Sequence, residues 1–306
     1  HRLHKRSRLT PATPATTSQK QEQTSLAHQA PQEILEAQTP ETSEVELGGN
    51  VVKRLLLPAF PTNNGVSMVT TLTHPESLAA EEYRRLCFNV EWGLKETLSG
   101  PCKTLMVTSA LPYEGKTITA VNLASTLARN HTVLLIDANF RKPAVHQAFG
   151  IPPEYGFSDL IEHQTIPHLF VPTERPNLSI LPAGLTLGHP ADLLSSQHMQ
   201  QFLDALKTSS SFEYAIFDVP PASVIPDASI LASKLDGIVW IIWELKTSKD
   251  LVRQALTRIT NPAILGVVLN YSEQRTLPRK YDKIWKSYRH DAQKLQHRTS
   301  PMNPPT

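Results

Sequence analysis

Residues 104–117 read TLMVTSALPYEGKT, and residues 118–127 continue as ITAVNLASTL. The first six residues form a short apolar run rich in β-branched side chains, which is typical of a buried strand. Residues 110–115 hold a proline and a glycine, which favour a turn. Small and apolar residues at helical spacing follow the turn. The stretch therefore predicts a strand, a tight loop and a helix in direct succession.

Five further apolar runs alternate with helical stretches in the same way: TVLLID (132–137), LSILPA (178–183), YAIFD (214–218), GIVWIIWE (237–244) and ILGVVLN (264–270). Near-continuous apolar strands that alternate with helices indicate a parallel sheet covered by helices on both faces. We therefore predict an α/β fold with a doubly wound, mostly parallel sheet over residues 75–270.

The rest of the chain differs in composition. Residues 1–48 are rich in Thr, Pro and Gln with almost no aromatic residues, which predicts a disordered arm because such a segment cannot offset the entropy of ordering. Residues 49–74 are predicted as a linker, and a helix that starts near Pro75 leads into the domain. Residues 271–306 carry eight Lys or Arg against three Asp or Glu, so we expect a flexible basic tail.

Composition argues against several classes of protein. A net charge of +2 is too small to favour a nucleic-acid partner. Cys87 and Cys102 are the only cysteines, and their spacing argues against a disulfide scaffold and a zinc site. The longest apolar run, residues 237–243, is far shorter than the ~20 residues of a transmembrane helix. We expect a cytoplasmic protein and leave open what precedes His1.

Residues 110–117 match the P-loop pattern A-x-x-x-x-G-K-T, with Ala in place of the first Gly. Such a loop needs Gly115 for close backbone approach to phosphate, Lys116 for the β/γ oxygens and the Thr117 hydroxyl for Mg²⁺. An ordinary strand-to-helix turn is the alternative. We expect ATP and Mg²⁺ as cofactors, with the nucleotide bound by Ala110, Pro112, Tyr113, Glu114, Gly115, Lys116, Thr117 and Ile118.

Two predicted strands end in an acid, Asp137 and Asp218. In an open α/β sheet the carboxyl ends of the strands converge on the ligand crevice, and carboxylates there can hold Mg²⁺ directly or through water. Strand-end aspartates can also simply cap a following loop. Beside a P-loop we expect both to be functional, so that the predicted metal ligands are Thr117, Asp137 and Asp218.

Three motifs together resemble the bacterial tyrosine kinases of capsule and exopolysaccharide assembly. SALPYEGKT is similar to the Walker A motif of that family, LLIDANFRKP to its second motif, and AIFDVPP to its Walker B motif. The resemblance covers residues 75–270. It implies that Lys116, Asp137 and Arg141 are catalytic, Asp137 as a Mg²⁺ contact or as the base, and Arg141 as the arginine that closes the second motif.

The resemblance also implies partners. Family members phosphorylate C-terminal tyrosines of a neighbouring subunit, which here implies Tyr281 and Tyr288, and a membrane-embedded chain-length regulator activates them. The implied location is the inner face of the cell membrane. A subunit contact through Glu81 and Arg84 of the first helix is also implied.

Departures from the motifs keep alternatives open. The second motif has Asn139 where the family has an acid, so the chain could be a degenerate kinase that binds ATP as a scaffold. The subunit-contact motif has Cys87 in place of its second arginine. A partitioning-type ATPase of the same fold is a further alternative, but Leu111 stands where its signature lysine belongs.

Overall fold

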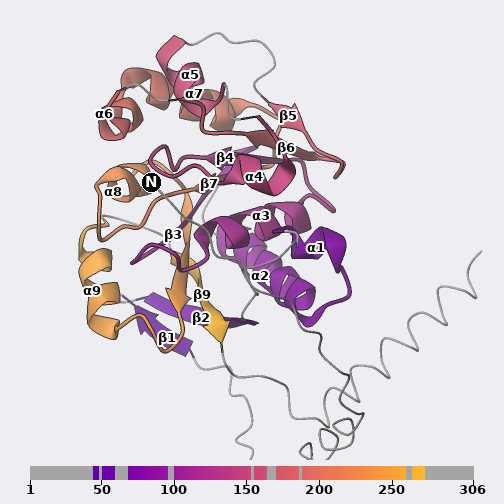
Figure 1. Ribbon diagram of the computed structural model, residues 1–306, viewed down its shortest axis with the longest axis vertical. Coiled ribbons are helices and arrows are strands. Elements are labelled where there is room, and N and C mark those ends of the chain that lie inside the picture. The colour runs from indigo at the N-terminus through magenta and orange to yellow at the C-terminus, as the bar shows by residue number, and fades with distance from the viewer. Residues whose placement is uncertain are drawn as a thin grey trace, which may run out of the picture. The chain divides into compact units, whose positions relative to one another are not determined.

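The structure is a computed structural model (Figure 1). It describes residues 44–47, 50–58, 68–95, 100–152, 155–163, 170–185, 188–259 and 264–272. Tyr281 and Tyr288, the predicted phosphoacceptors, lie outside these residues, as do most of the predicted arm and tail.

One sheet runs through the described part of the chain in the order β1-β2-β9-β8-β3-β7-β4-β6-β5. Its neighbouring strands pair in parallel, except for β1 with β2 and β5 with β6 at the two edges. The strands, in chain order, are β1 (Glu44–Leu47), β2 (Asn50–Pro58), β3 (Lys103–Ser109), β4 (Val133–Asp137), β5 (Val171–Pro172), β6 (Leu178–Leu181), β7 (Tyr214–Asp218), β8 (Gly237–Trp243) and β9 (Ile264–Ser272). The predicted mostly parallel α/β fold is confirmed.

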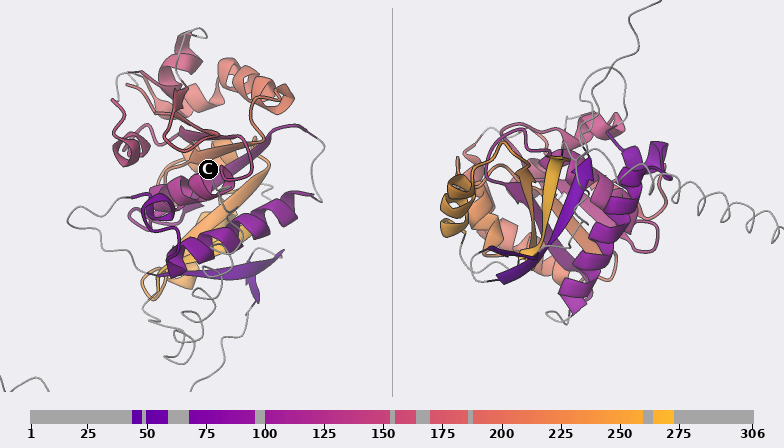
Figure 2. Two further views of the ribbon diagram at one scale, coloured as in Figure 1. Left: turned by 90° about the vertical axis from the view of Figure 1, so that its right-hand side faces the viewer. Right: turned by 90° about the horizontal axis from the view of Figure 1, so that it is seen from below.

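Helices cover both faces of the sheet because successive strand residues point to opposite sides. On β3, Leu105 and Val107 join the core under α1 to α4, whereas Met106 joins the core under α5 to α9. Seen from below, the strands lie between α2 and α9 (Figure 2). The first group is α1 (Thr70–Thr73), α2 (Leu78–Lys95), α3 (Lys116–Leu127) and α4 (Val145–Phe149). The second is α5 (Phe157–His163), α6 (Pro190–Ser195), α7 (Gln197–Thr208), α8 (Asp227–Ala232) and α9 (Lys249–Thr257).

The sheet reaches beyond the predicted strands. β1 lies in the stretch predicted as an arm, and β2, in the predicted linker, pairs in parallel with β9. Sequence patterning did not indicate β2 because Lys53 and Arg54 interrupt its apolar residues, as is common for strands near a sheet edge. β9 also continues through Tyr271, which was expected to follow the last strand. The extents of the four predicted segments stay predictions.

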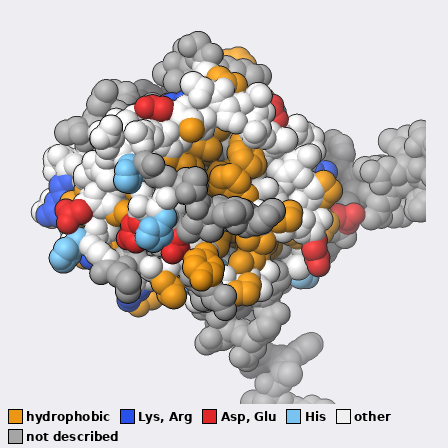
Figure 3. Space-filling view, turned by 90° about the horizontal axis from the view of Figure 1, so that it is seen from above, with side chains coloured by type: hydrophobic (Ala, Val, Ile, Leu, Met, Phe, Trp, Pro, Cys, Tyr) orange, Lys and Arg blue, Asp and Glu red, His pale blue; other side chains and the backbone are white. Residues whose placement is uncertain are grey.

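The surface of the described residues has local apolar areas. Viewed from above, hydrophobic side chains gather in a central hollow beside histidine and acidic side chains (Figure 3). On α2, Phe88 and Trp92 are 59% and 56% exposed and stack on each other. Among the helices described, none is long and apolar enough to cross a membrane.

Candidate active site

The predicted P-loop joins the end of β3 to the first turn of α3, as expected. Gly115 has a φ of 90°, which favours glycine, and a Cβ built there would lie 1.9 Å from Asn270 Nδ2. The same Nδ2 donates a hydrogen bond of 2.9 Å to the carbonyl oxygen of Glu114. Gly115 is therefore needed for the close contact between the loop and the end of β9.

Lys116 starts α3 and is only 7% exposed. Its Nζ donates to Ser109 Oγ at 3.2 Å and to the Leu111 carbonyl oxygen at 3.3 Å. Burial lowers the pKa of the lysine, while the charges of Asp218 and Glu114 act against that shift. The ammonium group is thus held inside the loop by two neutral acceptors, which an incoming phosphate could replace.

Asp137 and Asp218 end the neighbouring strands β4 and β7 and face each other in the register of the sheet. Both are fully buried. Burial, together with the negative charge of Asp137, raises the pKa of Asp218 to about 7, against the lowering effects of the Thr117 hydrogen bond and the Lys116 charge. Burial also raises the pKa of Asp137, against three backbone hydrogen bonds that lower it. Two buried carboxylates of like charge favour a cation between them.

The oxygen atoms at this point fit a magnesium ion. Asp218 Oδ2 accepts a hydrogen bond of 2.5 Å from the Thr117 hydroxyl, and Asp218 Oδ1 has no partner among the described residues. Magnesium is typically bound by one or two carboxylates and completes its shell with phosphate oxygens and water. Thr117 and Asp218 supply such oxygens, and an unsatisfied buried oxygen atom calls for a ligand.

Asp137 is engaged differently from Asp218. Its Oδ1 accepts from the backbone N–H of Asn139 at 3.1 Å, and its Oδ2 accepts from Ala144 and Val145 at 2.9 and 3.0 Å. The carboxylate therefore holds the loop after β4 in shape. The Asn139 side chain continues this network, since its Oδ1 accepts from the backbone N–H of Lys142 at 3.3 Å.

Arg141 forms a two-point ion pair with Asp227, the first residue of α8. Its Nε and Nη2 donate to the two carboxylate oxygens at 3.0 and 3.2 Å, and the Asp227 side chain is fully buried. Asp227 raises the pKa of Arg141. The arginine therefore ties the loop after β4 to α8, while 41% of its side chain remains exposed.

Glu114 is a structural anchor of the loop. It is 1% exposed, and its carboxylate accepts from the backbone N–H of Leu111 at 2.7 Å, from that of Trp243 at 3.3 Å and from the Thr247 hydroxyl. This links the P-loop to the end of β8. The other predicted loop residues differ in exposure, with Ala110 buried, Ile118 half-buried, and Pro112 and Tyr113 exposed.

An aromatic pair lies beside the loop. The rings of Trp243 and Tyr271 are 4.4 Å apart at their centroids, and Lys246 Nζ lies 3.6 Å from the Trp243 ring centroid. Trp243 is the last residue of β8. Sequence reasoning missed Asn270 and Asp227, although Asn270 ends an apolar run in the same way as Asp137 and Asp218.

Glu81 and Arg84, the predicted subunit contact, lie three residues apart on α2 and form an ion pair with each other. Arg84 also donates to the Pro75 carbonyl oxygen. Both interactions are within one chain, so the predicted contact between subunits stays a prediction.

The fold and the loop define a P-loop NTPase-type protein. Residues 114–256 match the model of the AAA domain family. The tyrosine-protein kinase YwqD of Bacillus subtilis (strain 168) is 34% identical over 219 residues, which cover 69% of this chain and 90% of the kinase. The succinoglycan biosynthesis transport protein ExoP of Rhizobium meliloti (strain 1021) is 32% identical, and the match covers 68% of this chain but 27% of that protein.

Among solved structures, the chimerical protein CapA2B2 superposes with a TM-score of 0.64 at 26% identity, covering 71% of this chain and 93% of that one. These likenesses extend over most of the described domain. The chain belongs to the family of bacterial tyrosine-protein kinases. The predicted family resemblance is therefore confirmed.

Proposed function

We propose that the chain is an ATP-dependent protein-tyrosine kinase that acts in capsular or exopolysaccharide synthesis and export. One observation carries the proposal: the Thr117 hydroxyl and the buried carboxylates of Asp137 and Asp218 meet next to Lys116, and Asp218 keeps an unpartnered oxygen. This combination of a loop lysine and metal-binding oxygens suits Mg²⁺-assisted phosphoryl transfer.

Each predicted residue has a role in this proposal. Lys116 would leave Ser109 and Leu111 to bind the β/γ phosphate oxygens. Thr117 and Asp218 would hold Mg²⁺, which would neutralise charge on the transferred group. The remaining nucleotide contacts come from the backbone of residues 110–118. Arg141 positions the loop after β4, through Asp227, and its exposed side offers positive charge near the phosphates.

The transfer itself forms a bond between a tyrosine oxygen and the γ-phosphorus while the bond to ADP breaks. The phenolic proton needs an acceptor, and Asp137 is the proposed base or metal contact. Its raised pKa, about 6, suits a proton acceptor near neutral pH. The proposed acceptors are Tyr281 and Tyr288 of a neighbouring subunit, with Glu81 and Arg84 in the contact between subunits.

We also propose a membrane-embedded regulator of polysaccharide chain length as partner, at the inner face of the cell membrane. The match to the transport protein ExoP supports this proposal. Because the match covers only 27% of ExoP, a region similar to this chain is there one part of a longer transport protein.

A second candidate function is an ATP-binding scaffold without turnover. It is favoured by Asn139, whose amide takes the place of a family acid and bonds within its own loop. An amide cannot accept the phenolic proton or offer a full charge to the metal.

The deciding experiment is incubation of the purified chain with labelled ATP and Mg²⁺, followed by mapping of phosphotyrosine. Label on tyrosine that disappears in Lys116→Met supports the kinase. Nucleotide binding without any label, even with a membrane regulator present, supports the scaffold instead.

A further inference from the structure

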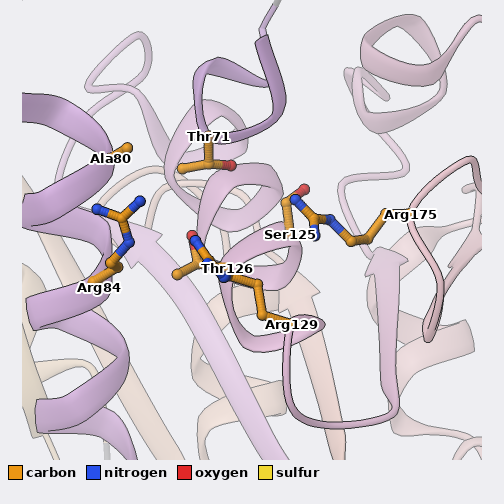
Figure 4. A pocket seen from close by; sticks show the side chains of 7 residues that line it. All are labelled: Thr71, Ala80, Arg84, Ser125, Thr126, Arg129 and Arg175. Atoms are coloured by element: carbon orange, nitrogen blue, oxygen red, sulfur yellow. The ribbon is translucent and has the colours of Figure 1, made fainter. Parts of the chain in front are cut away.

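A small cavity of about 10 Å³ lies between α1, α2, the end of α3 and the turn that joins β5 to β6. Its lining includes Thr71 from α1, Arg84 from α2, Ser125 from α3, Arg129 just after α3 and Arg175 from the turn (Figure 4). Ser125 is nine residues after Lys116, so the cavity lies roughly 14 Å along the helix axis from the P-loop. It is a separate site.

The cavity carries uncompensated positive charge. Arg84 is paired with Glu81, but the side chains of Arg129 and Arg175 form no ion pair with any residue that the structure describes. Burial lowers the pKa of Arg175, and the nearby charge of Arg129 lowers it further. The two arginines therefore line the cavity with no acid among its lining residues. Arg129 is exposed and Arg175 is half-buried, and each is expected to stay charged.

The wall of the cavity also holds polar atoms that lack partners within the described residues. They are Ser125 Oγ, Thr71 Oγ1 and Arg175 Nε, all inaccessible to solvent. Ser125 is fully buried and Thr71 is 7% exposed. Figure 4 shows Arg175 reaching toward Ser125 from the side opposite α2. Buried donors without acceptors are rare in proteins, so these groups indicate an acceptor-rich ligand.

We propose that this cavity binds a phosphate dianion, either as inorganic phosphate or as the phosphate monoester of a modified side chain. The two unpaired arginines match a charge near −2, which a phosphate group carries at neutral pH and a single carboxylate does not. The small volume admits one oxygen atom of a phosphate between the two hydroxyls and excludes a nucleotide base. The other phosphate oxygens would lie at the mouth of the cavity, beside the exposed Arg129. The proposal does not depend on the kinase function, because no P-loop residue lines the cavity.

Water is the competing occupant. A water molecule could bond the hydroxyls, and the negative end of the α3 dipole lies close to Arg129. Water cannot neutralise two guanidinium groups, however, and Arg175 is not at the helix end. The two occupants differ in one measurable way: only a phosphate site responds to phosphate at constant ionic strength.

The test uses Lys116→Met protein, so that the P-loop does not take up the probe. Inorganic phosphate is titrated at constant ionic strength against a chloride blank while nuclear magnetic resonance follows the amide signals of Ser125 and Thr126 and the Nε–Hε signals of Arg129 and Arg175. We expect saturable shifts at this cluster. Phenyl phosphate is titrated in parallel: tighter binding by tenfold or more identifies a phosphorylated tyrosine as the source, and equal or weaker binding identifies free phosphate.

Variants complete the test. Arg129→Gln and Arg175→Gln should each weaken phosphate binding tenfold or more, whereas Arg253→Gln, which removes an exposed charge on α9, should leave it unchanged. Arg175→Lys keeps the positive charge at this position. The melting temperatures of this variant and of the two glutamine variants show whether a loss of phosphate binding reflects misfolding. The proposal is wrong if phosphate causes no saturable shifts at the cluster, or if the two glutamine variants bind phosphate as tightly as the parent.

Discussion

The two ends of helix α3 differ in the charged side chains that surround them. At the N-terminal end, the ammonium of Lys116 lies among the buried acids Glu114 and Asp218, so buried side chains of both charge signs are present there. At the C-terminal end, Arg129 and Arg175 face a cavity without an acid. The first end combines opposite charges, whereas the charged residues that line the cavity at the second end all carry positive charge.

The difference in charge indicates which kind of ligand each end of α3 can bind. Burial raises the pKa of Asp137 to about 6 and that of Asp218 to about 7, so the fold keeps these acids in an unfavourable environment. Groups held in this way often mark functional sites because a ligand or metal relieves the cost. The C-terminal end needs no metal, only an anion.

The largest effect is expected from Lys116→Met, which removes the positive charge from the P-loop. Affinity for Mg·ATP should fall at least 100-fold, about 3 kcal/mol, because charge-assisted bonds to phosphate are lost. Calorimetric titration measures this, and Lys234→Met, which removes a lysine bonded to Gln200, is the control. Unchanged affinity in Lys116→Met would contradict the P-loop assignment.

The next largest effect is expected from Asp218→Asn, which keeps an acceptor for Thr117 but removes the charge. Binding of ATP should weaken more with Mg²⁺ than without it, since the carboxylate acts through the ion. At pH 8 the metal-free variant should also unfold about 2–4 °C higher, because about 1 kcal/mol of repulsion between buried charges disappears. Equal losses of affinity with and without Mg²⁺, together with a lower melting temperature, would make Asp218 a structural residue only.

Much of the N-terminal end could be predicted from sequence. The apolar runs, the glycine of the loop and the strand-end acids are local patterns, and each follows from a period or a spacing within a few residues. The reason for Gly115 could be predicted only in part, since its contact with Asn270 joins residues that are far apart in the chain.

The rest depends on long-range packing. The partner of Arg141 is Asp227, and the anchors of Glu114 come from β8 and the turn after it. Nothing in a single sequence pairs such residues. The arginine cavity could not be predicted at all, because its lining comes from four separate segments that only the tertiary structure brings together.

Asn139→Asp adds a third acid near the proposed metal position at the N-terminal end of α3. If the acid accepts the phenolic proton or orients Mg²⁺, autophosphorylation should rise about tenfold, which corresponds to about 1.4 kcal/mol of transition-state stabilisation. Counting of labelled phosphate over time measures the rate. Tyr281→Phe with Tyr288→Phe should remove most of the label, and Asn139→Asp combined with Lys116→Met is the inactive control. A wild type that already turns over well, with no gain in the variant, would mean that Asp137 alone suffices.

The smallest effect concerns a hydrogen-bonded network at the C-terminal end of α3. His131 lies between Glu91 on α2 and Glu213 before β7, at 3.0 and 3.1 Å, so acids at this end bind His131 and not the two arginines. The hydrogen bond from His131 lowers the pKa of Glu213, against a small effect of burial. The unfolded chain therefore binds more protons just below pH 4.5, and the stability from Glu213 is present above that pH and is lost as the pH falls through the folded pKa.

Glu213→Gln should lower the free energy of unfolding at pH 7 by less than about 1 kcal/mol, since half of the side chain is exposed and screened. Urea unfolding at pH 7 and pH 3.5 tests this, with Glu162→Gln on α5 as the control. An equal difference between wild type and Glu213→Gln at the two pH values would show that the carboxylate charge of Glu213 has no part in stability.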